Sequence, residues 1–349
     1  MKVIVTGATG NVGTSVIRAL SADPDVGEIV ALARRPPQRT LERARFHAVD
    51  VAAGDLTSVF TGAAAVVHLA WLIQPGRDES VTARVNLTGS RRVFEAVVAA
   101  RVPALVYASS VGAYSPGPKD RAVDESWPTN GIPSSFYSRH KSAVEGMLDE
   151  LAREQPRLRV VRLRPGLIFQ RGAAAEIRRL FAGPFLPTSL LRARLAPIAP
   201  DVAGLRFQAV HADDVGDAYR RAVLGDVAGP FNIAAEPAIG TPELAAMLDA
   251  RPVALPPRLL RAGAAAAYAL RLTPVEPGWL DLALGVPLMA TTRARHELGW
   301  VPTRTSVEAL QELVAGMRDG ADDRTPPLAR ATSGPGRIRE LLTGVGRRQ

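Results

Sequence analysis

The chain has 349 residues, of which 47% are hydrophobic and 22% are charged. This composition is typical of folded globular proteins and excludes a disordered or fibrous chain. The sequence contains no cysteine, which excludes disulfides, thiolate nucleophiles and cysteine-ligated zinc. Because the length exceeds what one hydrophobic core usually serves, we expect one large α/β domain and a smaller lobe.

The net charge of +9 raises the question of a nucleic-acid partner. The segment Arg324–Gln349 holds six arginines and one glutamate, a net charge of +5, which leaves +4 for the rest of the chain. Its glycines and prolines are typical of a poorly ordered end. Since no nucleic-acid-binding motif accompanies this charge, we expect no specific nucleic-acid partner.

A membrane location is also disfavoured. The chain begins MKVIVTG, which predicts a strand rather than a secretory leader. The most apolar helical stretch, Leu259–Leu272, contains Arg261 and Arg271 and is too short to span a bilayer. We therefore expect a cytoplasmic protein without membrane contact.

Short apolar runs alternate with longer amphipathic segments in the first half of the chain, as in repeated βα units. The apolar runs predict strands at Lys2–Thr6, Glu28–Ala33, Phe46–Val49, Ala65–Leu69, Ala104–Ala108 and Leu158–Leu163. Helices are predicted at Val12–Ser21, Glu79–Ala100 and Ser135–Glu154. Several strands are almost continuously apolar, which indicates burial on both faces. The predicted fold is α/β, a doubly wound parallel sheet of the Rossmann type with a smaller C-terminal substrate lobe.

This rhythm ends near residue 166, where prolines become dense between Pro184 and Pro200 and again between Pro252 and Pro287. We expect a dinucleotide-binding domain over residues 1–165 and a mixed substrate-binding lobe over 166–318 that partly returns to the first domain. Residues 319–349 are predicted to form a basic, disordered tail.

A glycine-rich turn follows the first predicted strand. Gly7 permits a tight turn, Gly10 lets the backbone approach a pyrophosphate, and Gly13 lets the helix pack closely on the strand. The amides at the start of the helix provide the anion-binding donors. The flanking strand and helix supply the context that such a motif requires, and they favour dinucleotide binding over a plain βα turn.

The end of the second predicted strand bears on the choice of cofactor. An acidic residue there would hold the ribose hydroxyls of NAD, but the chain has Arg34 and Arg35. Guanidinium groups suit a 2′-phosphate, so we favour NADP(H), with NAD(H) as the alternative. Two arginines that only solvate a turn are the competing interpretation.

The next two strand ends offer further contacts. Asp50 and Val51 follow the third strand, where a carboxylate and an amide could meet adenine, although Asp50 could equally be an ordinary loop residue. His68, near the end of the fourth strand, is interpreted as a hydrogen-bonded core histidine rather than a base. Trp71 follows it closely.

Tyr137 and Lys141 lie four residues apart on a predicted helix and so share one face. A phenol has a pKa near 10, too high for an efficient base at neutral pH, and a neighbouring ammonium lowers it. Ser109 and Ser110 directly follow the fifth strand, and Ser110 could hydrogen-bond a substrate oxygen opposite Tyr137. These three residues together predict an acid/base site beside a dinucleotide.

From Lys2 to about Gly316 the chain resembles an extended short-chain dehydrogenase/reductase of the NAD-dependent epimerase/dehydratase family. Besides the glycine turn, the serine and the Tyr137–Lys141 pair, the resemblance includes Asn86, Arg164-Pro165-Gly166, the segment His211–Val215, Phe231-Asn232-Ile233 and Glu297–Pro302. It implies Ser110, Tyr137 and Lys141 as the catalytic group. The cofactor-lining residues that it implies are Gly7, Thr9, Gly10, Asn11, Val12, Gly13, Arg34, Asp50, Val51, Leu69, Ala70, Tyr137, Lys141 and Pro165. A homodimer through the long helices is a further family-based expectation.

Two departures from the family concern the substrate. Sugar-nucleotide dehydratases carry an Asp-Glu pair directly after the catalytic hydroxyl residue, whereas this chain has Val111-Gly112. Many UDP-sugar epimerases have an arginine where this chain has Phe207, and Arg206 would point to the opposite face of a strand. A nucleotide-sugar substrate is therefore disfavoured, and Trp71, Tyr114 and Phe207 are predicted as apolar walls of the substrate site.

His211, Asp213 and Asp214 resemble a metal cluster, but we expect one of the aspartates to cap the helix that begins near Val215. No metal site is predicted.

The leading functional hypothesis is an NAD(P)-dependent oxidoreductase that transfers a hydride between the cofactor and a small-molecule secondary alcohol or ketone, with Tyr137 as acid/base. One alternative is a sugar or sugar-nucleotide epimerase that uses the same transfer transiently. The alternative from another class is a non-catalytic NADP-binding sensor or scaffold.

Overall fold

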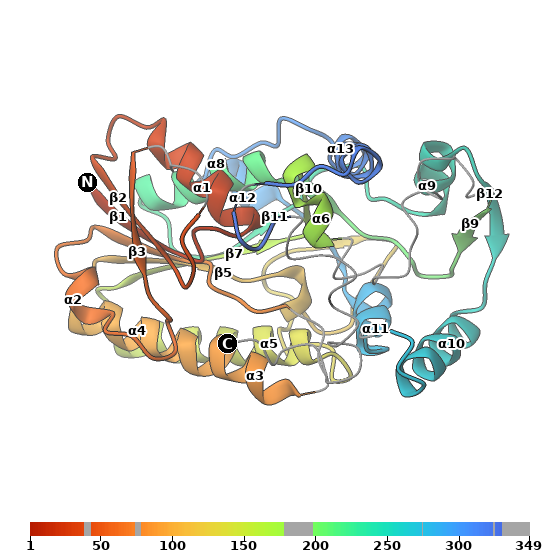
Figure 1. Ribbon diagram of the computed structural model, residues 1–349, viewed down its shortest axis with the longest axis horizontal. Helices are drawn as coiled ribbons and strands as arrows, with labels where there is room; N and C mark the ends of the chain where they lie inside the picture. Colours follow the sequence, from red (N-terminus) through yellow and green to blue (C-terminus); the bar gives the residue numbers. More distant parts are fainter. Residues whose placement is uncertain (38–42, 74–77, 178–197, 274, 324, 330–349) are drawn as a thin grey trace.

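A central parallel sheet organises the molecule (Figure 1). The computed structural model describes residues 1–37, 43–73, 78–177, 198–273, 275–323 and 325–329. Within these residues the main sheet has seven strands, and each neighbouring pair is parallel. In spatial order they are β11 (Gly229–Ile233), β7 (Arg159–Pro165), β5 (Ala104–Ala108), β4 (Ala65–His68), β1 (Lys2–Thr6), β2 (Glu28–Ala33) and β3 (Ala44–Ala48). The doubly wound fold predicted from the apolar runs is confirmed.

The strand predictions are most accurate at the centre of the sheet. β1, β2 and β5 have the predicted bounds, and every residue of β4 is buried. The third strand was predicted at Phe46–Val49 but lies at Ala44–Ala48, at the edge of the sheet, with half-exposed and exposed residues. Because an edge strand is not covered on both sides, its apolar pattern is weak and its bounds are hard to read.

Helices cover both faces of the sheet (Figure 1). The helix bounds are α1 (Asn11–Ser21), α2 (Thr57–Phe60), α3 (Glu79–Ala83), α4 (Ser90–Ala99), α5 (Phe136–Glu154), α6 (Ala174–Ile177), α8 (Ala212–Leu224), α9 (Thr241–Leu248), α10 (Pro257–Ala269), α11 (Gly278–Gly285), α12 (Thr292–Glu297) and α13 (Ser306–Asp319). Two large apolar cores result, one that joins α1 and α8 to the sheet and one that joins α4 and α5 to its other face. Burial of these apolar surfaces is the main driving force for the fold.

The predicted helix Glu79–Ala100 is interrupted. A π-helical turn, Arg84–Gly89, lies between α3 and α4. The side chain of Asn86 in this turn accepts a hydrogen bond from Leu72 N at 2.8 Å and donates one to Leu72 O at 3.0 Å. We attribute the extra residue in the turn to this pairing, which anchors Asn86 to the loop after β4.

The second half of the chain only partly forms a separate lobe. β11 extends the main sheet beside β7, and α8 packs on α1. The remaining strands form two-stranded pairs: β8 (Leu167–Phe169) with β10 (Ala209–His211), β9 (Ile198–Asp201) with β12 (Arg251–Ala254), and β6 (Ala122–Val123) with β13 (Leu288–Met289). α9, α10, β9 and β12 lie together at one end of the molecule (Figure 1). Parts of the loop after Trp71, most of the first proline-rich stretch and the basic tail from residue 330 lie outside the described residues.

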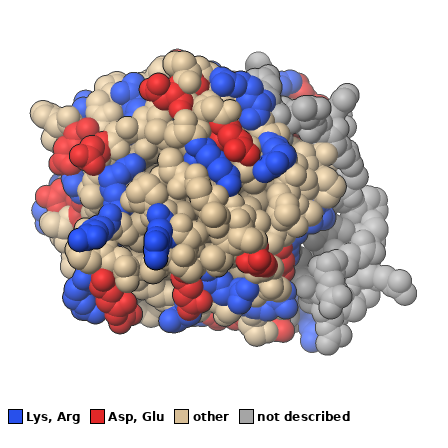
Figure 2. Space-filling view, turned by 90° about the vertical axis from the view of Figure 1, so that its left-hand side faces the viewer, with Lys and Arg blue, Asp and Glu red and all other residues tan. Residues whose placement is uncertain are grey.

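Two surface observations bear on partners. Over the described residues, none of the helices combines the length and the apolar character that a bilayer crossing requires. On the face shown in Figure 2, basic and acidic side chains are interspersed. The positive charge that this face carries is therefore not gathered into one continuous patch.

Candidate active site at the carboxyl edge of the sheet

The predicted site residues converge because the strands are parallel. The carboxyl ends of parallel strands share one edge, and ligands of such sheets bind beyond that edge. β1 leads into the glycine turn, β2 into Arg34, β3 into Asp50, β4 into Leu69 and β5 into Ser110, while Pro165 ends β7. The fold thus brings together segments from the first half of the chain that are far apart in sequence.

The glycine turn has the backbone geometry that only glycine allows at two positions. Gly7 has a φ of +71°, and a Cβ there would lie 2.7 Å from Ala70 N. A Cβ on Gly13 would lie 2.4 Å from Gly7 O. These contacts let α1 start directly against β1, with Leu69 and Ala70 packed beside the turn.

The start of α1 provides an anion site of the type expected for a pyrophosphate. Gly10 is the N-cap residue, no side chain caps the helix, and its first turn contains no acidic residue. Among the described residues, a Cβ on Gly10 would have Gly7 O, at 3.4 Å, as its one close neighbour, so these residues leave the space beside Gly10 open. Amide donors at such a terminus suit phosphate oxygens, and the chain therefore fits a dinucleotide.

The other residues implied as cofactor contacts differ in how their side chains are used. Asn11 donates from Nδ2 to Ile168 O at 3.1 Å and accepts from Gln170 Nε2 at 2.6 Å, so its side chain links α1 to β8 and its neighbour. Asp50 forms an ion pair with Arg84 at 3.1 Å. Thr9 and Val51 are buried, and Val12 is half-buried.

Arg34 and Arg35 are both exposed beyond the end of β2. Desolvation and the charge of Arg34 lower the pKa of Arg35. Two neighbouring guanidiniums that repel each other would be stabilised by an anion between them.

His68 is a hydrogen-bonded core residue, as predicted. Its Nδ1 lies 2.7 Å from Thr6 Oγ1 and its Nε2 lies 3.0 Å from Ser90 Oγ. Burial and the charge of Lys141 lower the pKa of His68 to about 3. The ring is therefore neutral at physiological pH and holds β4 to β1 and α4.

Ser110, Tyr137 and Lys141 meet beyond β5. Ser110 Oγ accepts a hydrogen bond from Gly112 N at 3.0 Å and lies close enough to Tyr137 to lower the pKa of the phenol. Lys141 Nζ lies 5.9 Å from the centre of the Tyr137 ring and donates to Ala108 O at 2.6 Å. A Cβ on Gly112 would lie 2.7 Å from Tyr137 Cε1, so glycine is required here for the ring to approach Ser110.

The pKa of Tyr137 differs from the sequence-based expectation. Burial raises it to about 12, and the hydrogen bond from Ser110 offsets only part of this effect. Burial also lowers the pKa of Lys141, which Glu145 partly restores. The expected lowering by Lys141 is not found, because its ammonium faces the Ala108 carbonyl and the indole of Trp71, whose ring centre lies 3.5 Å away.

Glu145 is a site-supporting residue that the sequence reasoning missed. Its buried carboxylate accepts hydrogen bonds from Ser109 Oγ at 2.5 Å, from Arg162 Nη1 at 3.0 Å and from Arg164 Nε and Nη2 at 2.8 and 2.9 Å. Burial alone would raise the pKa of Glu145, but Arg164, Arg162 and Ser109 together lower it to about 2. The sequence signal that could have identified Glu145 is its position four residues after Lys141, one turn further on the same helix face.

Trp279 is the second missed residue. Its indole lies over the Tyr137 ring with ring centres 5.2 Å apart and planes tilted by 35°. The start of α11 approaches the loop before α5 so closely that a Cβ on Gly278 would lie 2.2 Å from Ser134 O. The Trp71 indole meets the same phenol edge-on, with ring centres 6.1 Å apart. The indole Nε1 of Trp71 is buried without a hydrogen-bond partner among the described residues.

Of the three predicted walls, only Trp71 lies beside Tyr137. Tyr114 is fully buried, and its hydroxyl donates to Asn232 Oδ1 at 2.7 Å and accepts from Arg164 Nη1 at 3.0 Å, so its prediction as a wall is wrong. Phe207 packs in a different apolar cluster with Ile239 and is not brought beside Tyr137, so its role as a wall stays a prediction. Arg206 points elsewhere, as expected, and donates to Lys119 O at 2.8 Å.

The acidic cap predicted near Val215 is replaced by a histidine cap. α8 begins at Ala212, and its N-cap is the buried His211, whose Nδ1 accepts from Asp213 N at 3.1 Å. Asp214 instead accepts hydrogen bonds from Thr303 N and Oγ1. Across the ranges that the structure describes, no group of three or more histidines and carboxylates has a geometry that could hold a metal ion.

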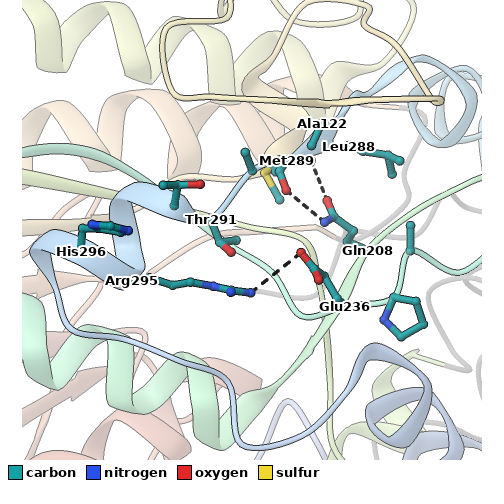
Figure 3. Close-up of a pocket in the computed structure, with 12 residues that line it drawn as sticks. Ala122, Gln208, Glu236, Leu288, Met289, Thr291, Arg295 and His296 are labelled. Atoms are coloured by element: carbon teal, nitrogen blue, oxygen red, sulfur yellow. Dashed lines mark hydrogen bonds and ion pairs between the residues drawn. The ribbon is translucent and has the colours of Figure 1, made fainter.

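A separate cleft of about 790 Å³ lies between the β6–β13 pair and α12 (Figure 3). Gln208 in its wall accepts a hydrogen bond from Met289 N at 2.7 Å and donates to Met289 O at 3.0 Å. Arg295 and Glu236 face each other across it at 3.9 Å. None of the predicted catalytic or cofactor residues lines this cleft.

The fold and the site together define a dinucleotide-binding protein of the Rossmann type. The sequence profile of the family described as "NAD dependent epimerase/dehydratase family" matches residues 3–234. The chain belongs to this family, which confirms the resemblance inferred from its motifs.

Three similar proteins illustrate the range of the relatives. An uncharacterised protein of Mycobacterium tuberculosis is 28% identical over 321 residues, which cover 91% of this chain but 30% of that protein. The chain thus spans less than a third of that relative's length. The decarboxylating sterol-4-alpha-carboxylate 3-dehydrogenase of Saccharomyces cerevisiae is 28% identical over 183 residues, 49% of this chain and 52% of that protein. The structure of UDP-glucose 4-epimerase from Thermotoga maritima, solved with UDP-glucose, superposes with a TM-score of 0.69 at 21% identity, covering 92% of this chain and 99% of that one.

Proposed function

We propose that the chain is an NAD(P)-dependent oxidoreductase that interconverts a secondary alcohol and the matching ketone. The observation that carries this proposal is the meeting of Ser110, Tyr137 and Lys141 beside a helix terminus suited to a pyrophosphate. A bound nicotinamide would exchange a hydride with the substrate carbon.

The chain's own residues handle the proton and the orientation. Tyr137 gives a proton to the carbonyl oxygen in reduction and takes the hydroxyl proton in oxidation. Ser110 holds the same oxygen by a hydrogen bond, since its hydroxyl already contacts the Tyr137 side chain. Lys141 Nζ lies 5.9 Å from the centre of the Tyr137 ring, and its proposed role is to bind a cofactor ribose rather than to lower the pKa of the phenol.

The proposal is tested by Tyr137→Phe, which removes the hydroxyl and keeps the ring. Turnover is measured on secondary alcohols and ketones by the absorbance of the reduced nicotinamide. We expect a loss of about 10²- to 10⁴-fold in kcat, with the cofactor Kd unchanged. Tyr268→Phe on α10 is the matched control and should retain activity. Full activity of the Tyr137 variant would favour a non-catalytic sensor or scaffold.

The second candidate function is an epimerase, in which the same hydride transfer is transient. An epimerase would return the hydride to the other face of the ketone, and the structural similarity to a UDP-glucose 4-epimerase supports testing this reading. Product formation without net change in nicotinamide absorbance would identify an epimerase. A stoichiometric change would identify a dehydrogenase.

We further propose a preference for NADP(H) over NAD(H). The exposed pair Arg34–Arg35 at the carboxyl end of β2 supports it, because guanidiniums bind a 2′-phosphate well. Calorimetry on wild type and Arg34→Glu tests it. The substitution should weaken NADP⁺ binding about tenfold or more and leave NAD⁺ binding less affected. Tighter wild-type binding of NAD⁺ would contradict the preference.

A further inference from the structure

The described residues that surround the Tyr137 ring are largely apolar and aromatic. The Trp279 indole lies over the Tyr137 ring with ring centres 5.2 Å apart. The Trp71 indole meets it edge-on with ring centres 6.1 Å apart. Val111, directly after Ser110, packs with Tyr137 and Trp279 against an apolar cluster whose buried members are Ile132, Leu282 and Val286. Two hydroxyls therefore emerge from a largely apolar and aromatic wall.

Within the part of the chain that the structure describes, the charged groups nearest this wall make contacts inside the protein. Glu276 accepts a hydrogen bond from Phe136 N at 3.3 Å, and Glu79 pairs with Arg139 at 2.5 Å. Lys141 is directed to Ala108 O and to the indole of Trp71. Each of these described groups therefore has at least one partner within the protein.

A basic pair beside α11 is also occupied. Lys119 Nζ donates to Arg206 O at 2.8 Å and to Ala283 O at 2.9 Å, and Arg206 donates back to Lys119 O. A nucleotide diphosphate needs charged donors directed at its oxygens, preferably bidentate guanidiniums. Lys119 instead directs two hydrogen bonds, and Arg206 one, at backbone carbonyls.

We propose that the substrate is a secondary alcohol or ketone on an apolar ring skeleton, held against the indoles of Trp71 and Trp279 while its oxygen meets Ser110 and Tyr137. This inference rests on the proposed oxidoreductase function and adds the substrate class. Lys141 Nζ covers one face of the Trp71 indole and Tyr137 lies against one face of Trp279, so a fused ring would contact the other faces, which offer a large apolar area. Against this wall of described residues, a sugar ring would instead bury hydroxyls without matching partners.

Three probes separate the substrate classes: cyclohexanol, decahydro-2-naphthol and UDP-glucose. We expect kcat/KM for decahydro-2-naphthol to exceed that for cyclohexanol about tenfold or more, because each methylene group in an apolar pocket discriminates by about 10- to 200-fold. Trp279→Ala should reduce this ratio about tenfold, and Trp279→Phe should largely keep it. Trp127→Phe is the control, since Trp127 donates to Ser115 O at 3.3 Å and belongs to a different apolar cluster.

The outcomes distinguish this inference from the function on which it rests. Turnover of UDP-glucose that depends on Tyr137 and exceeds that of both alcohols would overturn the substrate class and leave the oxidoreductase in place. An unchanged ratio in Trp279→Ala would also overturn it. Where no probe is turned over, calorimetry on the cofactor-loaded protein decides. If decahydro-2-naphthol binds and Trp279→Ala weakens this binding about tenfold, the apolar site is supported and the catalytic assignment is overturned. If decahydro-2-naphthol does not bind, the apolar site and the catalytic assignment are both overturned.

Discussion

Replacing Glu145 by glutamine tests how the site is held together. The carboxylate is fully buried and joins α5 to β7 through Arg162 and Arg164, and to the end of β5 through Ser109. Glutamine has nearly the same shape but no charge. The variant would therefore leave two buried guanidiniums without their main counter-charge, although Arg162 keeps an ion pair with Asp149 at 2.6 Å.

The expected loss in the free energy of unfolding is about 3–5 kcal/mol, the usual cost of removing one partner of a buried ion pair. The pKa gives an independent figure of the same order. A carboxyl whose pKa falls from 4.5 to about 2 stabilises the folded state by about 3 kcal/mol at neutral pH. Urea denaturation of wild type and variant measures the difference.

The matched control is Glu150→Gln on the same helix. Glu150 pairs with Arg153 at 3.8 Å, and both side chains are more than half exposed. We expect a change within about 0.5 kcal/mol, as for other surface pairs. A loss below about 1 kcal/mol for Glu145→Gln would refute the reasoning, since the carboxylate would then contribute no more than a surface charge.

The pH dependence has a definite sign. Because the pKa of Glu145 is lowered in the folded state, its stabilisation is complete above about 4.5, the ordinary pKa of the group, and is lost as the pH falls toward 2. The stability difference between wild type and Glu145→Gln should therefore shrink across this window. A difference that stays constant from neutral pH down to pH 2 would show that the charge is not its origin.

Three further predictions concern the site itself. Gly112→Ala should displace the Tyr137 ring, because the new Cβ would lie 2.7 Å from Cε1 of that ring. We expect kcat to fall about tenfold or more with little change in Tm, as measured by steady-state kinetics and a thermal melt. Gly7→Ala should destabilise the fold by about 1–3 kcal/mol and weaken cofactor binding, because φ is +71° and Ala70 N lies 2.7 Å from the new atom; denaturation and calorimetry would detect both. Since the pKa of Tyr137 is raised to about 12, alcohol oxidation should accelerate with rising pH above neutrality, whereas ketone reduction should slow only at high pH; a pH-independent oxidation rate would contradict a phenolate base.

The sequence predicted the elements whose signals are local. The central strands β1, β2 and β5 were predicted to the residue because runs of Val, Ile, Leu and Ala mark burial on both faces. The glycine turn and the Tyr137–Lys141 spacing could also be predicted, because each pattern lies within a few consecutive residues. The bounds of β3 were not, because an edge strand lacks this pattern.

The features that were missed depend on contacts between distant segments. Trp279 reaches Tyr137 only because Gly278 lets α11 approach Ser134, and no local pattern around either residue indicates this. The π-helical turn arises from the pairing of Asn86 with Leu72. The pKa of Tyr137 is raised rather than lowered because burial, a tertiary property, sets its direction, while the charge of Lys141 one turn away adds no opposing shift.

The two serines that follow β5 connect the buried carboxylate of Glu145 to the residues proposed to react. Two consecutive serines leave the strand, and their side chains serve different partners: Ser109 donates to Glu145, while Ser110 contacts Tyr137. The carboxylate that holds Ser109 also sits on the helix that carries Tyr137 and Lys141. A shift of that carboxylate would therefore move the serine and the phenol relative to each other. For this reason we expect Glu145→Gln to lower kcat more than it raises KM, as befits a residue that positions the reacting groups without touching the substrate.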